Sequence, residues 1–214
     1  MSAHNWSASL RALLFDPDRF FENRTPRTGV AGLVVTVVAV LHAVLLVAIV
    51  GLSVVQLSLL QSEVGLGELL GESAGAVVGE AVVLLVSVFL NWLLVSALLH
   101  VVVKLLDGRG RFGATLYVVG WSSPVALLTM LVGGASILLA VQGLDPGGTI
   151  EPQLQRVSGV VGGAGALGSL LVLLWQGYIW PAGLERTHEM ARDKAVQATG
   201  VTVFLGIVAT LLTL

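Results

Sequence analysis

Two glycine-rich strings are the first places in this sequence where residue spacing resembles a site for chemistry. Both read Gly-x-Gly-x-x-Gly, at Gly108, Gly110 and Gly113 and again at Gly163, Gly165 and Gly168. A dinucleotide site with this spacing needs a strand before it, a helix after it and an acidic residue about 20 positions further on. Here the first string lies between two long apolar segments and the second lies inside one. We therefore expect no nucleotide site.

Other catalytic and metal-binding patterns are also missing. The histidines at positions 4, 42, 100 and 188 do not have the spacing of metal ligands. The sequence contains no cysteine, and Gly120-Trp-Ser122 continues into Ser-Pro, so it does not form the Gly-x-Ser-x-Gly turn of a nucleophilic serine. Asp107-Gly108 resembles the start of a lipid phosphotransferase motif, but the further aspartates of such a site are absent. The sequence thus predicts no enzyme, no metal site and no cofactor.

Three polar residues inside apolar segments form a candidate intramembrane polar cluster: His42, Glu80 and Asn91. A charged carboxylate in the middle of a bilayer costs about 2.5–3.5 kcal/mol. Glu80 is close enough to the end of its segment to reach the interface, whereas Asn91 should face protein. The three residues either satisfy each other across helices or line a proton or solute path. The second alternative makes the protein a small transporter or permease subunit, with a water-accessible cavity between the first two spans.

The composition of the chain indicates that these residues lie in membrane-spanning helices. The chain has 214 residues, of which 56% are hydrophobic and only 11% are charged, against about 25% charged in soluble domains. Its mean hydropathy is +0.93. One helical crossing of a bilayer takes about 20 residues, so the chain has room for about five. A net charge of −2 argues against nucleic acid as a partner.

The fold class we predict is all-α: a polytopic membrane protein with a bundle of five transmembrane helices. Residues 1–28 form a cytoplasmic N-terminal segment, in which Trp6, Leu10, Leu13 and Leu14 recur at roughly helical spacing, so that it is amphipathic. Asp16 and Pro17 fit the N-cap and first position of a second short helix. Residues 29–214 form the transmembrane domain. Its spans are expected near 30–58, 76–104, 115–141, 157–180 and 196–214.

The basic residues predict the orientation. With five spans drawn, ten of the eleven Lys and Arg residues fall on one side and only Arg156 falls on the other. Basic residues beside spans stay in the cytoplasm. The N-terminus is therefore expected in the cytoplasm, the C-terminus outside, and the protein in a prokaryotic cell membrane.

Small residues mark one face on each of the last two spans. The fourth span carries Ser158, Gly162, Gly165, Ser169 and Gln176, and the fifth carries Thr199, Thr202, Gly206, Thr210 and Thr213. Small side chains let helices approach closely in lipid. We expect helix–helix interfaces at these faces, either within one bundle or between the subunits of a homo-oligomer.

Three motifs give the chain a resemblance to a known family. The central one joins the basic loop 104–112, Lys-Leu-Leu-Asp-Gly-Arg-Gly-Arg-Phe, to Thr-Leu-Tyr-Val-Val-Gly-Trp-Ser-Ser-Pro at 115–124. Asp-Pro-Asp-Arg-Phe-Phe at 16–21 precedes the first span, and Trp-Pro-Ala-Gly-Leu-Glu-Arg-Thr-His at 180–188, with Lys194-Ala195, precedes the last. In their order and spacing these motifs resemble the Yip family, the Ypt/Rab-interacting membrane proteins. The short N-terminal region resembles the prokaryotic type of member.

The resemblance implies a non-enzymatic scaffold or adaptor that organises membranes or recruits protein partners at its cytoplasmic face. Eukaryotic relatives recruit Rab-type GTPases. Acids are interleaved with bases in the 104–115 loop and the 181–195 connection, so we expect these two segments to pair with each other or with a polar protein partner. Besides the lipid bilayer, the expected partner is thus a protein at the cytoplasmic loops. The candidate partner surface is Lys104, Asp107, Arg109, Arg111, Arg186 and His188.

Overall fold

A computed structural model describes residues 3–22, 24–60, 66–144 and 150–212 of the chain. Helices account for nearly all of these residues, and none of them is in a strand. The helices are α1 (Ala3–Phe15), α2 (Pro17–Glu22), α3 (Thr28–Leu60), α4 (Leu66–Leu105), α5 (Phe112–Ser122), α6 (Leu127–Gln142), α7 (Ile150–His188) and α8 (Arg192–Leu212). A short 3-10 turn, η1 (Ser123–Ala126), joins α5 to α6. The predicted all-α fold is confirmed.

Five helical stretches are long and apolar enough to cross a membrane, as predicted. They are Thr28–Gln56, Gly75–Leu105, Phe112–Gln142, Gln155–His188 and Arg192–Leu212. The third is not one continuous α-helix. Pro124 lies in η1, and because proline has no N–H to donate, the α-helical ladder is interrupted there.

The fourth stretch runs further than the sequence suggested. The sequence predicts a charged connection at 181–195, but α7 continues through Pro181 to His188. Ala182 and Leu184 are fully buried, and this packing compensates for the backbone hydrogen bond that Pro181 cannot make. The connection between α7 and α8 is therefore only the turn at 189–191.

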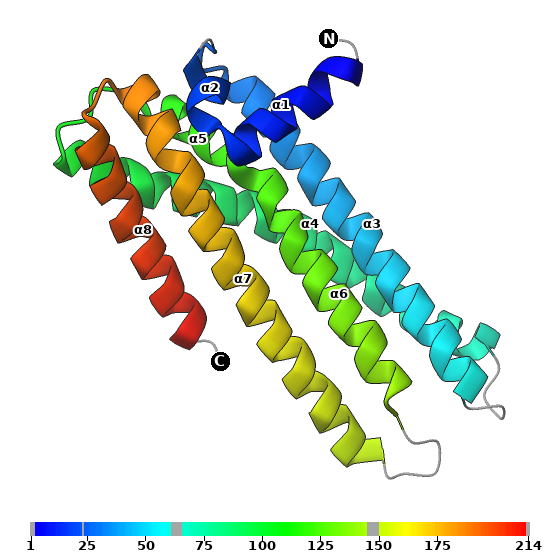
Figure 1. The fold of residues 1–214 in the computed structure, drawn as a ribbon. Helices are drawn as coiled ribbons and strands as arrows, with labels where there is room; N and C mark the ends of the chain where they lie inside the picture. The colour runs from blue at the N-terminus through cyan, green and yellow to red at the C-terminus, as the bar shows by residue number, and fades with distance from the viewer. Residues whose placement is uncertain (1–2, 23, 61–65, 145–149, 213–214) are drawn as a thin grey trace.

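The helices pack in a layered bundle. α3 contacts α4, α5 and α6; α7 lies between α6 and α8; and α4 also contacts α8. Figure 1 shows α1 lying across one end of this bundle, beside α2. The α4–α5 loop (106–111) and the 189–191 turn lie at the same end, which we name the charged end.

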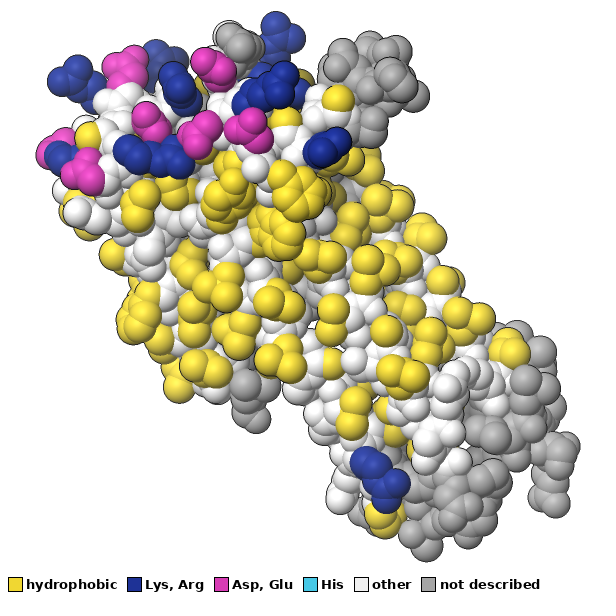
Figure 2. Space-filling model, viewed as in Figure 1, with side chains coloured by type: hydrophobic (Ala, Val, Ile, Leu, Met, Phe, Trp, Pro, Cys, Tyr) yellow, Lys and Arg dark blue, Asp and Glu magenta, His cyan; other side chains and the backbone are white. Residues whose placement is uncertain are grey.

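Burial is uneven along the bundle. Fully buried large side chains such as Leu13, Leu99, Trp180 and Leu184 belong to the elements of the charged end. Along the rest of the bundle, valines and leucines are exposed on the outer helix faces, for example Leu94 and Leu167. Figure 2 shows most of the visible charged side chains gathered at one end, above a broad hydrophobic surface. The chain is thus an integral membrane protein, with lipid in contact with that surface.

The small-residue faces are only partly used within the chain. A Cβ at Gly162 or Gly165 would meet nothing within 4 Å, so these two glycines are not at an interface inside the bundle. At Gly168, in contrast, a Cβ would lie 3.1 Å from Thr129 Cα of α6. Gly206 of α8 faces Leu173 of α7. On this part of α7 the close intramolecular contact is therefore made at Gly168 and not at Gly162 or Gly165. An interface between subunits at Gly162 and Gly165 stays a prediction.

Candidate functional site

The three motif segments meet at the charged end through an aromatic cluster. α2 begins at Pro17, and Asp16 caps it by accepting the Arg19 N–H at 3.3 Å, as the sequence predicted. Phe20 and Phe21 then turn inward and are buried. The Phe20 ring lies 5.0 Å from that of Trp121, and the Phe21 ring lies 6.1 Å from that of Tyr117. Edge-to-face contacts of this kind fix α2 on α5.

α7 is fixed in the same core by its aromatic side chains. The indole N–H of Trp180 donates to Ser122 Oγ at 2.8 Å, and both residues are fully buried. Gly183 lets α7 approach closely, because a Cβ there would lie 2.7 Å from Val118 of α5. Two bonds hold α1 on α7: the Trp175 indole donates to Leu14 O at 3.1 Å, and the Tyr178 hydroxyl donates to Phe15 O at 3.2 Å.

A polar chain of three side chains crosses this core. Thr115 Oγ1 lies 2.9 Å from His100 Nδ1 and 3.0 Å from His188 Nε2. His188 is fully buried, and its Nδ1 has no hydrogen-bond partner among the described residues. A buried N–H without an acceptor is costly, so we assign the His188 proton to Nε2. Nε2–H then donates to Thr115, and the Thr115 hydroxyl donates to His100.

The 106–111 loop lies directly against the end of α7. The Arg109 backbone N–H donates to His188 O at 2.9 Å. A Cβ at Gly110 would lie 2.6 Å from Thr187 O, so only glycine fits there. Positive φ angles occur at Asp107 (66°) and Glu189 (50°), just after α4 and α7 end, and at none of the described glycines. The loop glycines serve close contact instead.

Ion pairs complete this arrangement. Lys194 of α8 donates to Asp107 at 2.9 Å, and this hydrogen bond and the lysine charge hold the pKa of the Asp107 carboxyl below its usual range. Arg192 bridges Asp18 of α2 at 2.6 Å and Glu185 of α7 at 3.0 Å. The two segments that the sequence predicted to pair do contact each other in the structure.

A second feature lies between the helices of the bundle, away from the charged end. A cavity of about 340 Å³ between α3, α4, α6 and α7 is lined by His42, Ser87, Asn91, Thr129 and Gln176, among mostly apolar side chains. A neighbouring cavity of about 450 Å³ between α4, α7 and α8 shares Asn91, Thr129 and Gln176. The amides of Asn91 and Gln176 make no hydrogen bond to any residue that the structure describes. His42 Nδ1 donates to Val38 O at 2.9 Å, which leaves Nε2 as an acceptor when the ring is neutral.

Comparison with known protein families identifies the family of this chain. The model of the Yip1 domain matches residues 11–213, nearly the whole chain. The chain belongs to the Yip1 family. No match was found among curated proteins or among solved structures. The residues by which the sequence resembled this family are those that build the aromatic cluster, the polar chain and the loop contacts at the charged end.

The candidate partner surface that the sequence predicted is mostly accessible to solvent. Lys104, Asp107, Arg109, Arg111 and Arg186 are exposed. Lys104 donates to Gly108 O, and Asp107 is paired with Lys194. His188 does not belong to this surface, because it is fully buried. Its place in the sequence among charged residues suggested exposure, but Gly110 leaves room for its ring beneath the loop.

The predicted intramembrane cluster is only partly assembled. His42, which is buried, and Asn91, which is exposed, line the same cavity, whereas Glu80 is exposed and lines neither cavity. Helical periodicity places Glu80 and Asn91 on similar faces of α4, but it does not show which helix lies opposite. The predicted polar cluster omitted two residues that line the same cavity, Gln176 of α7 and Thr129 of α6. Among the described residues, no group of three His, Cys, Asp or Glu side chains is placed to hold a metal ion.

Proposed function

We propose that this Yip1-family protein is a non-enzymatic scaffold or adaptor that recruits a protein partner at the charged end. The observation that carries this proposal is the presentation of Arg109, Arg111 and Arg186. All three are exposed, and within the described part of the chain none of them takes part in an ion pair. The nearby Arg192 and Lys194 form ion pairs that stabilise the fold, whereas these three arginines are available to bind a partner.

The loop that carries two of these arginines is held in place before any partner binds. The Arg109 backbone is bonded to His188, and Asp107 is tied to α8. A surface ordered in advance loses less conformational entropy on binding. Arginine is also enriched in protein interfaces, where it pairs with carboxylates through two parallel bonds. The partner we expect therefore presents an acidic surface.

The orientation belongs to the same proposal. Charges gather at one end of the bundle (Figure 2), and basic residues beside spans remain in the cytoplasm. We place the charged end and the N-terminus in the cytoplasm of a prokaryotic cell and the C-terminus outside.

Charge reversal tests the partner surface. The double variant Arg109→Glu/Arg111→Glu should insert normally and lose its co-purifying acidic protein, because the loop is held by its backbone and by Asp107 rather than by these two side chains. Arg156→Glu, at the opposite end of α7, is the matched control and should keep that protein. Topology is checked in each variant by protease protection. If the correctly inserted double variant retains every co-purifying protein, the surface does not recruit a partner.

A second function is supported by the two cavities between the helices. The polar groups of Asn91 and Gln176, without partners among the described residues, would suit a transporter or permease subunit that passes a small uncharged solute. This alternative requires water in the cavity. Because the chain contains no cysteine, Thr129→Cys provides a single thiol there, and Leu131→Cys provides a control on the exposed face of α6. A charged, water-soluble thiol reagent should modify the first and not the second. An unreactive thiol at position 129 would exclude a solute path.

A further inference from the structure

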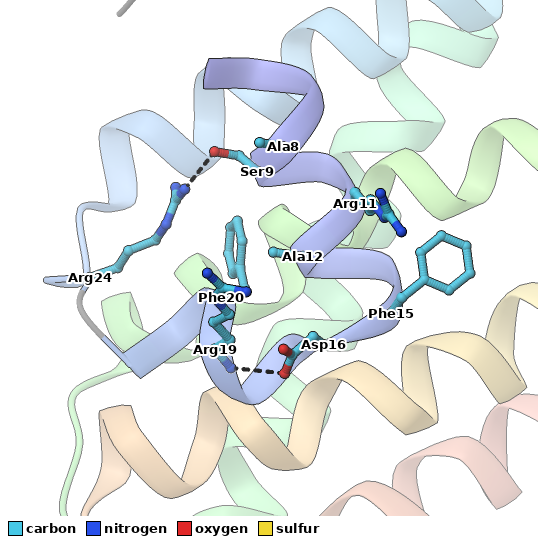
Figure 3. Close-up of a pocket in the computed structure, with 9 residues that line it drawn as sticks. All are labelled: Ala8, Ser9, Arg11, Ala12, Phe15, Asp16, Arg19, Phe20 and Arg24. Atoms are coloured by element: carbon cyan, nitrogen blue, oxygen red, sulfur yellow. Dashed lines mark hydrogen bonds between the residues drawn. The ribbon is translucent and has the colours of Figure 1, made fainter. Parts of the chain in front are cut away.

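A basic pocket lies between α1 and α2, apart from the loop surface described above. It has a volume of about 640 Å³ and is lined by Ser9, Arg11, Asp16, Arg19, Phe20 and Arg24, among others. Three arginines and one aspartate leave it with a formal charge of +2. Figure 3 shows Arg19 and Arg24 on the α2 side of the hollow and Arg11 on α1 beside Phe15.

Arg24 is held in position by the aromatic cluster. Its guanidinium carbon lies 4.1 Å from the centre of the Phe20 ring and 5.2 Å from that of Trp121. One of its N–H groups donates to Ser9 Oγ at 2.9 Å. Cation–π contacts of this kind fix a guanidinium without neutralising it. Arg24 forms no ion pair with the described residues, so its other N–H donors are available to an anion.

The single acid in the pocket does not cancel this charge. Asp16 is occupied as the N-cap of α2, where its carboxylate accepts the Arg19 N–H at 3.3 Å. Neither Arg19 nor Arg11 makes an ion pair with a described residue, and both are exposed. The pocket therefore offers two guanidinium groups at its centre and a third at its edge, with donors suited to phosphate oxygens.

The edge of this pocket has the character of a membrane interface. Phe15 is 65% exposed, and its ring lies 5.9 Å from that of Trp175. Tyr178, which is also exposed, holds the C-terminal end of α1 through its hydroxyl. Tryptophan and tyrosine gather at headgroup depth in membrane proteins. α1 lies across the bundle end at this level (Figure 1), so the pocket opens where phospholipid headgroups lie.

We infer that the α1–α2 pocket binds the phosphate group of an anionic phospholipid. Arg19 and Arg24 hold the phosphate oxygens, Arg11 adds positive charge at the edge, and Phe15 contacts the acyl region. A phosphate free in solution would use the same donors. The exposed aromatic side chain at the edge favours the lipid, because a free anion gains nothing from contact with it.

Native mass spectrometry of the full chain in detergent micelles tests this inference, with phosphatidylglycerol and phosphatidylcholine as probes. Wild type should retain phosphatidylglycerol preferentially. Arg19→Gln should weaken that binding about tenfold, the effect of one charge-assisted hydrogen bond. Arg27→Gln is the matched control: it removes the same charge from an exposed position at the same end, outside the pocket, and should leave affinity unchanged.

A second variant separates pocket geometry from net charge. Arg24→Lys keeps the charge but loses the planar guanidinium that stacks on Phe20 and presents paired donors. Phosphatidylglycerol binding should therefore fall. A thermal unfolding measurement on the same variant checks that its stability is retained. Equal losses in Arg19→Gln and Arg27→Gln would overturn the inference, since they would indicate general attraction to the charged end. Displacement of phosphatidylglycerol by inorganic phosphate at equal concentration would overturn the lipid assignment in favour of a free anion.

Discussion

At the scale of single residues, Thr115 connects the motifs of this chain most directly. Its hydroxyl lies between His100 of α4 and His188 of α7, while its backbone belongs to α5. α4, α5 and the sequence-distant α7 thus depend on one fully buried hydroxyl group. A buried hydroxyl group of this kind contributes little to the free energy of folding while it is hydrogen-bonded, but its removal leaves its polar partners unsatisfied.

Thr115→Val tests this dependence. Valine has nearly the same shape, so the change removes the hydroxyl and leaves His100 Nδ1 and His188 Nε2 without their partner. We expect unfolding in detergent micelles to become easier by about 1–3 kcal/mol. Thr36→Val is the control, because Thr36 is exposed and, among the described residues, bonds only to Gly32 O of its own helix. Thr115→Ser should restore stability, and equal stability of Thr115→Val and wild type would contradict the role of the hydroxyl.

At the scale of elements, the packing of α7 differs along its length. Gly168→Leu should destabilise the bundle by about 1–3 kcal/mol, because a side chain at this position would collide with the α6 backbone. Gly162→Leu should have little effect, since a Cβ there meets nothing. Thermal unfolding of the two variants in dilute micelles compares them. Similar losses in both would show that the face of α7 carrying Gly162 is also packed, as in a homo-oligomer.

The loop after α4 is joined to α8 by an ion pair that depends on pH. The pKa of Asp107 is lower in the folded chain than in the unfolded chain, so the pair stabilises the fold above the unfolded value of about 3.9. That contribution disappears as pH falls through the lowered folded value. Asp107→Asn tests it, because asparagine also tolerates the positive φ at this position.

The expected difference is small, since the Asp107 side chain is 86% exposed and solvent screens the pair. Asp107→Asn should be less stable than wild type near pH 7 and equally stable well below the pKa of the carboxyl. A melting-temperature difference that stays constant over this range would show that the ion pair is not its source.

The sequence predicted elements better than it predicted their contacts. Five apolar stretches and the Asp16–Pro17 helix start are local patterns, and local patterns can be read without tertiary information. The burial of His188 depends on the space that Gly110 leaves in another segment. The cavity beside Asn91 likewise depends on Gln176, which is distant in sequence. Periodicity gives the face of a helix, but only packing shows what lies opposite.

At the scale of the whole molecule, the chain is asymmetric. The motif segments, the ion pairs and the basic pocket share one end, while long helices with exposed apolar faces make up the rest (Figures 1 and 2). An acidic protein partner in the cytoplasm and an anionic lipid of the inner leaflet can both reach that end only if it faces the cytoplasm. This orientation is the central requirement of both proposals.

Labelling of single cysteines measures this orientation directly. Ala191→Cys lies in the turn at the charged end and Gln155→Cys lies near the opposite end of α7; both replace exposed, uncharged residues, so the charge distribution is unchanged. The chain has no cysteine of its own. A membrane-impermeant maleimide added to intact cells should label position 155 and not position 191, and both should react after permeabilisation. Labelling of position 191 in intact cells would place the charged end outside and contradict both proposals.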